Sequence, residues 1–238
     1  MHVEVYPDSE ALAHGAATHF VRLAAAAIAE HGRFSVALAG GSTPEAMHRA
    51  LASEAFAPRV DWERVHVFWG DERCVPPDHA ESNYRMARET LLDGVPIPAR
   101  NVHRMRAEIG PEAAADEYEA ALRAFFGADG PPRLDLIFLG MGDDGHTASL
   151  FPGTAAVHET AGWVAAHHVA KLGAWRVTLT PAVLNAAANV IFLVAGAHKA
   201  ARLREVLHGP YQPDALPAQV VKPAAGRLLW LVDQAAVA

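Results

Sequence analysis

The chain has 238 residues, of which 51% are hydrophobic and 20% are charged, and its formal net charge is -7. The length fits one large α/β domain or two small ones, and the composition excludes an intrinsically disordered chain. No stretch is rich in Lys or Arg, which argues against a nucleic-acid partner. Local groups would have to bind an anionic ligand, because the net charge opposes it at long range.

The sequence shows no signal for export or for membrane insertion. Residues 1–10 lack the basic and apolar regions of a signal peptide. The apolar stretch at residues 21–30 is short, rich in Ala and flanked by charge, which predicts a packed helix rather than a membrane span. Cys74 is the one cysteine, so an intrachain disulfide is excluded. We therefore expect a cytoplasmic protein with no membrane partner, and we expect a monomer.

Hydrophobic periodicity and capping signals divide the chain into strands and helices. Apolar runs predict strands at residues 2–6, 34–39, 64–70, 134–140, 175–180, 189–196 and 226–233. N-cap residues, helix-initial prolines and terminal glycines predict helices at residues 8–32, 44–56, 81–92, 111–127, 181–188 and 198–207. Because the two alternate and several strands are almost wholly apolar, we expect a three-layer α/β/α fold around a mainly parallel sheet.

Two Pro/Gly-rich segments, at residues 127–132 and 208–223, interrupt this pattern only briefly. The alternation resumes after each, so we interpret them as loops inside one domain. Residues 1–238 are expected to form a single α/β domain that carries the site. In folds of this kind ligands bind beyond the carboxyl ends of the strands, so the residues that follow each strand are the candidates for a functional site.

The first such loop is GGSTP, after the second predicted strand. Gly41 lets the backbone approach a ligand, and Ser42 and Thr43 offer hydroxyl groups. Pro44 begins a helix whose free N–H groups face the loop, which favours an anion. Neither GxxxxGK[ST] nor GxGxxG is present, so one phosphate fits better than a nucleotide. The alternative is an ordinary strand–turn–helix connection with Thr43 as N-cap.

The third predicted strand is followed by DERC. Asp71 is placed to orient or move a proton, and Arg73 is placed to bind an anion. The alternative is a charged turn without function. Cys74 as a nucleophile is a weaker hypothesis, because no neighbouring residue specifies its base. We interpret Cys74 as a structural thiol.

The loop GMGDDGH follows the fourth strand and places Asp144 two residues before His146. A carboxylate can fix the tautomer of an imidazole and stabilise its charged form. His146 is therefore a candidate general base, although it is one of 14 histidines. A metal site made of Asp143, Asp144 and His146 is the alternative. Because a ligand motif such as HExxH is missing, we expect no metal.

Two cationic residues complete the set. Lys199 falls in the first turn of a predicted helix, where a cation opposes the helix dipole unless a phosphate is bound. The alternative is that Lys199 is a solvated surface lysine without function. Arg176, at the start of the strand at 175–180, is a weaker candidate for binding the same anion. Together these strand ends predict an acid–base site facing a phosphorylated small molecule.

At these residues the chain resembles the 6-phosphogluconolactonase family. The matching motifs occur in the family's order and span most of the chain: LAGGSTP, VFWGDERCVPPDHAESNY, GMGDDGHTASLFPG and RVTLTPAVLNAAANVIFLVAGAHKA. The wider superfamily includes glucosamine-6-phosphate isomerase/deaminases, which share the phosphate loop and the Asp-Gly-His segment. Arg73 and the HTASLFPG run resemble the lactonases, because the isomerases typically carry an aromatic residue where Arg73 stands.

The resemblance implies a sheet of the sugar-phosphate isomerase type, with no metal and no nucleotide cofactor. It implies hydrolysis of 6-phospho-D-glucono-1,5-lactone to 6-phosphogluconate, the second step of the oxidative pentose phosphate pathway. His146 would act as base toward water, with Asp144 orienting it and Asp71 assisting. The phosphate would be held by Gly41, Ser42, Thr43, Arg73 and Lys199, assisted by Arg176.

Two other functions stay open on the sequence. One is an isomerase or deaminase of an amino-sugar phosphate, with Asp71 as the base that removes a proton from carbon. The other is a non-catalytic sugar-phosphate sensor. A serine acyl-enzyme is less well supported, because the GxSxG motif of nucleophile elbows is absent.

Overall fold

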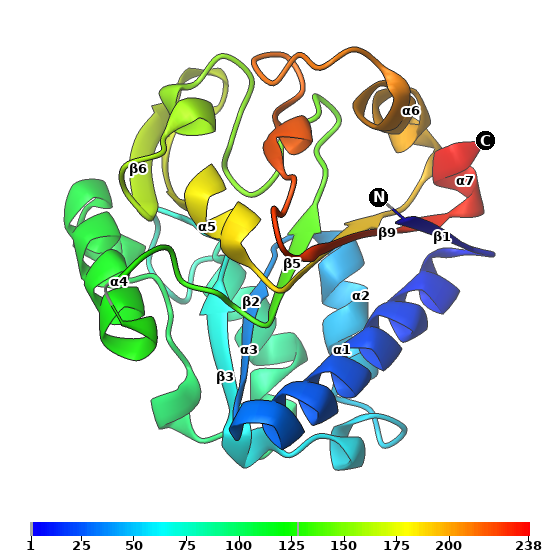
Figure 1. Cartoon of the computed structure of the whole chain (residues 1–238), viewed down its shortest axis with the longest axis vertical. Helices are drawn as coiled ribbons and strands as arrows, with labels where there is room; N and C mark the ends of the chain where they lie inside the picture. Colours follow the sequence, from blue (N-terminus) through cyan, green and yellow to red (C-terminus); the bar gives the residue numbers. More distant parts are fainter. Residues whose placement is uncertain (1, 128) are drawn as a thin grey trace.

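The computed structural model describes residues 2–127 and 129–238. Its main feature is a parallel six-stranded sheet in the order β1-β9-β8-β5-β2-β3. Figure 1 shows helices flanking this sheet. The α/β class and the mainly parallel sheet expected from the sequence are confirmed. The strands are β1 (His2–Tyr6), β2 (Phe34–Leu38), β3 (Val65–Trp69), β5 (Leu136–Gly140), β8 (Asn189–Val194) and β9 (Arg227–Asp233).

The helices begin and end at the capping signals that the sequence carries. In the first helix the Asp8 side chain accepts a hydrogen bond from the Ala11 N–H at 2.8 Å, and Gly32, with φ of 86°, ends the helix. None of the described helices has the length and apolar character needed to cross a membrane. The α-helices are α1 (Ser9–His31), α2 (Ser42–Leu51), α3 (Asn83–Thr90), α4 (Pro111–Phe126), α5 (Pro181–Ala186), α6 (Ala200–His208) and α7 (Gln234–Val237).

Helix α2 departs from the prediction of a helix over 44–56. It starts at Ser42 rather than at Pro44, and its N-cap is Gly41, which has φ of 102°. A residue with a side chain rarely adopts this φ, so the glycine permits the sharp entry from the strand. The helix ends at Leu51, and shorter turns follow.

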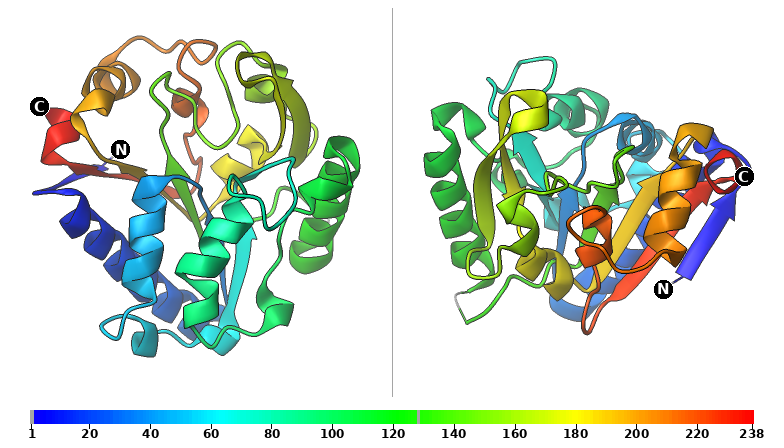
Figure 2. Two further views of the ribbon diagram at one scale, coloured as in Figure 1. Left: turned by 180° about the vertical axis from the view of Figure 1, so that it is seen from behind. Right: turned by 90° about the horizontal axis from the view of Figure 1, so that it is seen from above.

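A second, antiparallel sheet was not predicted. It has the order β4-β7-β6, with β4 (Asp71–Arg73), β7 (Ala174–Leu179) and β6 (Val164–Val169). The sequence indicated a charged loop for β4 and no element for β6, because the first has only three residues and the second lacks an apolar run. Helix α4 packs against β6 and β7, as Figure 2 shows in the view from above.

Gly70 joins the two sheets. Its N–H donates to the Leu38 carbonyl of β2 at 2.9 Å, and its carbonyl accepts from the Leu179 N–H of β7 at 2.8 Å. One hydrophobic cluster includes buried side chains from both sheets. The residues that follow β3 therefore pass directly from the parallel sheet into the second sheet.

Candidate active site

The carboxyl ends of four neighbouring strands lie at one edge of the parallel sheet. The strands β8, β5, β2 and β3 are adjacent and parallel, so the loops that follow them gather at one edge of the sheet. A cavity of about 250 Å³ lies between the loop after β5, the residues that follow β3, and the β6–β7 hairpin of the second sheet. Five of the nine residues predicted for the site line it, namely Asp71, Arg73, Asp144, His146 and Arg176.

His146 and Asp144 form a hydrogen-bonded pair on the loop after β5. The Nδ1 atom of His146 lies 2.6 Å from Asp144 Oδ1. This bond, and then Lys171, hold the pKa of Asp144 well below its ordinary value. The ionised carboxylate only accepts hydrogen bonds, so Nδ1 carries the proton and a neutral imidazole has its lone pair on Nε2. The pair is thus arranged to accept a proton at Nε2.

Two neighbours fix the plane of the His146 ring. Phe151 stacks on it, with ring centroids 4.1 Å apart and an interplanar angle of 24°. Gly142 passes so close that a Cβ atom there would lie 2.1 Å from His146 Nδ1. The position therefore requires glycine, and the GMGDDGH spacing is explained by close approach rather than by turn propensity alone.

The Asp71 carboxylate is buried and fixed by hydrogen bonds to both of its oxygens. Its side chain is almost fully buried, and its Oδ2 accepts from the Ser149 hydroxyl at 2.6 Å. The Asn83 amide donates to the Asp71 carbonyl at 2.9 Å and to Oδ1 at 3.2 Å. Because both carboxylate oxygens are engaged, this geometry favours a positioning role for Asp71 over general-base chemistry.

The backbone beside Ser149 is strained. Ala148, with φ of 46°, is the one residue other than glycine with positive φ in the described parts of the chain. This conformation costs an alanine roughly 1–2 kcal/mol. Hydrogen bonds on either side maintain it, from Thr147 Oγ1 to the Gly140 carbonyl at 2.8 Å and from Ser149 to Asp71. The strained residue, Ala148, lines the cavity, and backbone strain often occurs at functional sites.

Arg73 and Arg176 contribute positive charge to the cavity, which Lys171 also lines. Arg73 donates to the Glu81 carbonyl at 2.7 Å, and Arg176 donates to the Trp175 carbonyl at 3.0 Å. Within the described chain neither guanidinium pairs with a carboxylate, and the Arg73 Nε is buried without a partner. Carbonyl contacts leave the charge of both groups available to an anion.

Four predicted residues do not line this cavity. Gly41 caps helix α2, and Ser42 and Thr43 form its first turn. Lys199 ends a short 3-10 turn before α6, and its ammonium lies 2.5 Å from Asp143 Oδ1. Asp143 does line the cavity, so Lys199 reaches the site through an ion pair that the sequence had not indicated. The phosphate-binding role of these four residues stays a prediction.

The remaining residues of the DERC loop have structural explanations. Glu72 is buried and accepts the N–H groups of Asn83 and Tyr84, each at 2.8 Å, which caps the start of α3. Burial raises the pKa of the Cys74 thiol to about 11, so the thiol is protonated at neutral pH. This supports the interpretation of Cys74 as a structural thiol.

No metal centre is evident in the described chain. Among residues 2–127 and 129–238, no group of three or more His, Cys, Asp or Glu side chains is arranged to hold a metal ion. Asp143, the third member of the alternative metal set, instead pairs with Lys199.

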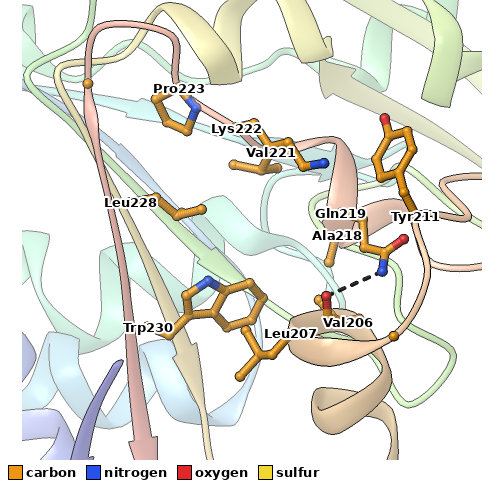
Figure 3. A pocket seen from close by; sticks show the side chains of 12 residues that line it. Val206, Leu207, Tyr211, Ala218, Gln219, Val221, Lys222, Pro223, Leu228 and Trp230 are labelled. Carbon is orange, nitrogen blue, oxygen red and sulfur yellow. Dashed lines mark hydrogen bonds between the residues drawn. The ribbon is translucent and has the colours of Figure 1, made fainter. Parts of the chain in front are cut away.

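A second cavity, of about 480 Å³, lies between α6, the following loop and β9 (Figure 3). Its walls are largely apolar, and its titratable lining residues are Tyr211 and Lys222. The Lys222 ammonium lies 3.9 Å from the centroid of the Tyr211 ring. The Gln219 amide donates to the backbone of the neighbouring segment, including the Val206 carbonyl at 3.3 Å. This cavity lacks the acid–base pair and is not the candidate active site.

Three residues of the site were not identified from the sequence: Asn83, Ser149 and Lys171. Ser149 lies inside the HTASLFPG motif and Asn83 inside the motif that follows β3, so the motifs contained them without assigning a role. Lys171 lies in the connection between β6 and β7, and nothing local distinguishes it from a solvated lysine.

The carboxyl edge of the parallel sheet carries a histidine–aspartate pair, and the second sheet adds two arginines that face the same cavity. This arrangement is typical of an α/β protein with an acid–base site for an anionic ligand. Comparison with known families is more specific. The model described as glucosamine-6-phosphate isomerases/6-phosphogluconolactonase matches residues 7–230, and the chain belongs to this family.

Individual relatives cover nearly the whole chain. A 6-phosphogluconolactonase of Nostoc sp. is 44% identical over 237 residues, which are 98% of this chain and 96% of the relative. A 6-phosphogluconolactonase of Synechocystis sp. is 47% identical over 213 residues, 88% of this chain and 86% of the relative. The solved 6-phosphogluconolactonase of Trypanosoma brucei is similar with a TM-score of 0.87 and 31% identity, over 98% of this chain and 96% of that chain. The family expected from the motifs is confirmed.

Proposed function

We propose that this chain hydrolyses 6-phospho-D-glucono-1,5-lactone to 6-phospho-D-gluconate, a reaction of the oxidative pentose phosphate pathway. The observation that carries the proposal is the His146–Asp144 pair, which lines the same cavity as Arg73 and Arg176. The names of the Nostoc and Synechocystis relatives support the lactone as substrate rather than an amino-sugar phosphate.

In the proposed reaction His146 acts first as a base. Its Nε2 removes a proton from water while the water oxygen forms a bond to the lactone carbonyl carbon, and the carbonyl electron pair moves onto oxygen. The Asp144 carboxylate stabilises the resulting imidazolium through Nδ1. When the tetrahedral intermediate collapses, the bond from that carbon to the ring oxygen breaks. The imidazolium returns its proton to the ring oxygen, which becomes a hydroxyl group.

Arg73 and Arg176 bind the phosphate in this proposal and thereby position the lactone beside His146. Positioning an ester next to a base contributes several powers of ten to the rate. Gly41, Ser42, Thr43 and Lys199 remain proposed as further phosphate contacts, supported by the free N–H groups of the first turn of α2. Asp71 is proposed as a positioning residue, supported by its bonds to Ser149 and Asn83.

We further propose a cytoplasmic enzyme that acts as a monomer and as one catalytic domain, with no metal or other cofactor. The single hydrophobic cluster that spans both sheets supports one domain. The presence of one cysteine and no possible intrachain disulfide is consistent with the cytoplasm. Size-exclusion chromatography with light scattering tests the monomer.

The function is tested by producing the lactone in situ with glucose-6-phosphate dehydrogenase and following 6-phosphogluconate with its own dehydrogenase. The spontaneous hydrolysis rate is subtracted. We expect an excess rate that falls about 10²- to 10⁴-fold in His146→Ala. His208→Ala is the matched control, because His208 is an exposed residue at the end of α6.

If an excess rate survives in His146→Ala, the chain is still a lactonase, but a residue other than His146 acts as the base. The absence of any excess rate would overturn the proposal, and release of ammonia from glucosamine 6-phosphate would then identify the isomerase/deaminase activity instead.

A further inference from the structure

Two adjacent carboxylates on the loop after β5 are each held by a lysine from a different element. Lys199, at the start of α6, pairs with Asp143. Lys171, in the connection between β6 and β7, places its ammonium 2.9 Å from Asp144 Oδ2. The chain has only three lysines, so two of them are committed to this loop.

The Lys171 contact is on the opposite oxygen of Asp144 from the one that His146 uses. Oδ1 accepts from the His146 ring, and Oδ2 accepts from Lys171. The carboxylate is thus fixed at both ends, and its plane, which determines the direction of the His146 bond, cannot rotate freely. Lys171 and His146 also line the same cavity from opposite segments of the chain, the hairpin of the second sheet and the loop of the first.

The Lys171–Asp144 ion pair also affects how readily the His146 imidazole accepts a proton. A carboxylate beside an imidazole favours the imidazolium, and an imidazolium has no lone pair with which to accept a proton. A cation on the far side of that carboxylate opposes this effect. The other charged groups facing the cavity are Asp71, Arg73, Arg176 and Asp143, the last already paired with Lys199 and close to His198. His167 and His168 line an adjoining cavity together with Asp144 and Lys171, and the His167 ring is bound to the Ser149 carbonyl. Arg202 donates to the Asp143 carbonyl at 3.2 Å.

We propose that Lys171 is a positioning residue of the reaction, which orients Asp144 and keeps the His146 imidazole in its neutral, proton-accepting form. The proposal rests on the proposed function, since it assigns His146 the role of base. Lys171 does not touch the reacting atoms in this mechanism, and it acts through Asp144 alone.

The test compares Lys171→Met with Lys171→Arg, which keeps the charge. Lys171 is 69% exposed, so solvent screens its charge and the effect is moderate. We expect Lys171→Met to lower kcat by roughly two- to fivefold near pH 6, about the effect of one exposed ion pair, with a smaller loss at pH 8.5. The acidic limb of the kcat/KM profile moves to higher pH, and Lys171→Arg restores it. Lys222→Met, which removes a lysine charge from the second cavity, leaves the profile unchanged.

A double-mutant comparison shows whether Lys171 acts through Asp144. In an Asp144→Asn background the Lys171→Met change is expected to have no further effect on the pH profile. A rise of KM at every pH, with the profile in place, would overturn the proposal and make Lys171 a direct ligand of the substrate. Equal activity of all variants at all pH values would also overturn it.

A measurement on the free protein separates this inference from the function. The His146 ring signal, assigned by its loss in His146→Gln, is followed by NMR across the pH range in the wild type and in Lys171→Met. We expect its titration midpoint to move to higher pH in the variant. An unmoved midpoint contradicts the role of Lys171 while leaving lactone hydrolysis intact. If the midpoint moves but the wild type has no lactonase activity, the electrostatic effect of Lys171 on His146 stands and the proposed function is wrong.

Discussion

Arg73 on β4 and Arg176 on β7 are directly opposed cross-strand partners in the second sheet. Side chains at opposed positions of an antiparallel pair project to the same face with Cβ atoms roughly 4.5–5.5 Å apart. Burial, followed by the charge of Arg73, lowers the pKa of Arg176 from its ordinary value. Two like charges in this register destabilise each other in the free protein, and an anion bound by both would reverse that effect.

Replacing either arginine by glutamine should therefore weaken substrate binding more than turnover. Each Arg73→Gln or Arg176→Gln change removes a charged hydrogen bond of about 1.5–3 kcal/mol, which corresponds to an increase in KM of about 10- to 150-fold. Steady-state kinetics with the phosphorylated lactone measures the effect. Arg100→Gln is a matched control, because that guanidinium is exposed and pairs with Glu63.

The same variants should lose discrimination between phosphorylated and unphosphorylated substrate. With glucono-1,5-lactone, we expect the Arg variants and the wild type to have similar kcat/KM, since no phosphate is present to contact them. An equal loss on both lactones would show that the arginines maintain the fold of the site rather than bind phosphate.

Ser149→Ala should destabilise the protein through Asp71. The variant removes the 2.6 Å hydrogen bond to a buried carboxylate oxygen and leaves it without that donor. The expected loss in the free energy of unfolding is about 1–3 kcal/mol, measured by urea denaturation. Ser53→Ala is the comparison, because its hydroxyl donates to the Ala50 carbonyl at 2.6 Å and no buried charge depends on it. The idea fails if both variants lose the same stability.

His48 predicts a specific pH dependence of stability. Complete burial in α2 lowers its pKa to about 3, from 6.5. The unfolded chain takes up a proton near pH 6.5 that the folded chain does not bind, so this residue makes stability fall as the pH decreases below that value. Between pH 7.5 and 5.5 the loss from His48 is about 1.4 kcal/mol.

The variant His48→Leu should lack this loss, because it has no group to protonate in the unfolded state. Urea denaturation at the two pH values measures the difference, with His208→Leu as an exposed control that should retain the wild-type pH dependence. A loss in His48→Leu as large as that of the wild type would assign the acid sensitivity to other groups, of which His103 is the next candidate because burial lowers its pKa to about 4.

The strands of the parallel sheet and the loop that carries the His146–Asp144 pair were determined by local sequence. β2 and β5 are buried apolar runs, and glycine loops follow them, because a strand covered on both faces admits few polar residues. The pairing of His146 with Asp144 was also local, since only one residue separates them in the chain. Parallel topology then places the successive strand ends at one edge, which is why separate loops could be predicted to meet.

Only the tertiary structure decided how the site is supported. The bond from Ser149 to Asp71 spans 78 residues, and the bond from Lys171 to Asp144 spans 27. Both depend on the second sheet, whose strands β4 and β6 carry no apolar run that would predict them. Local propensity reports how a segment folds, whereas the partner of a buried carboxylate depends on which distant segments the chain brings beside it.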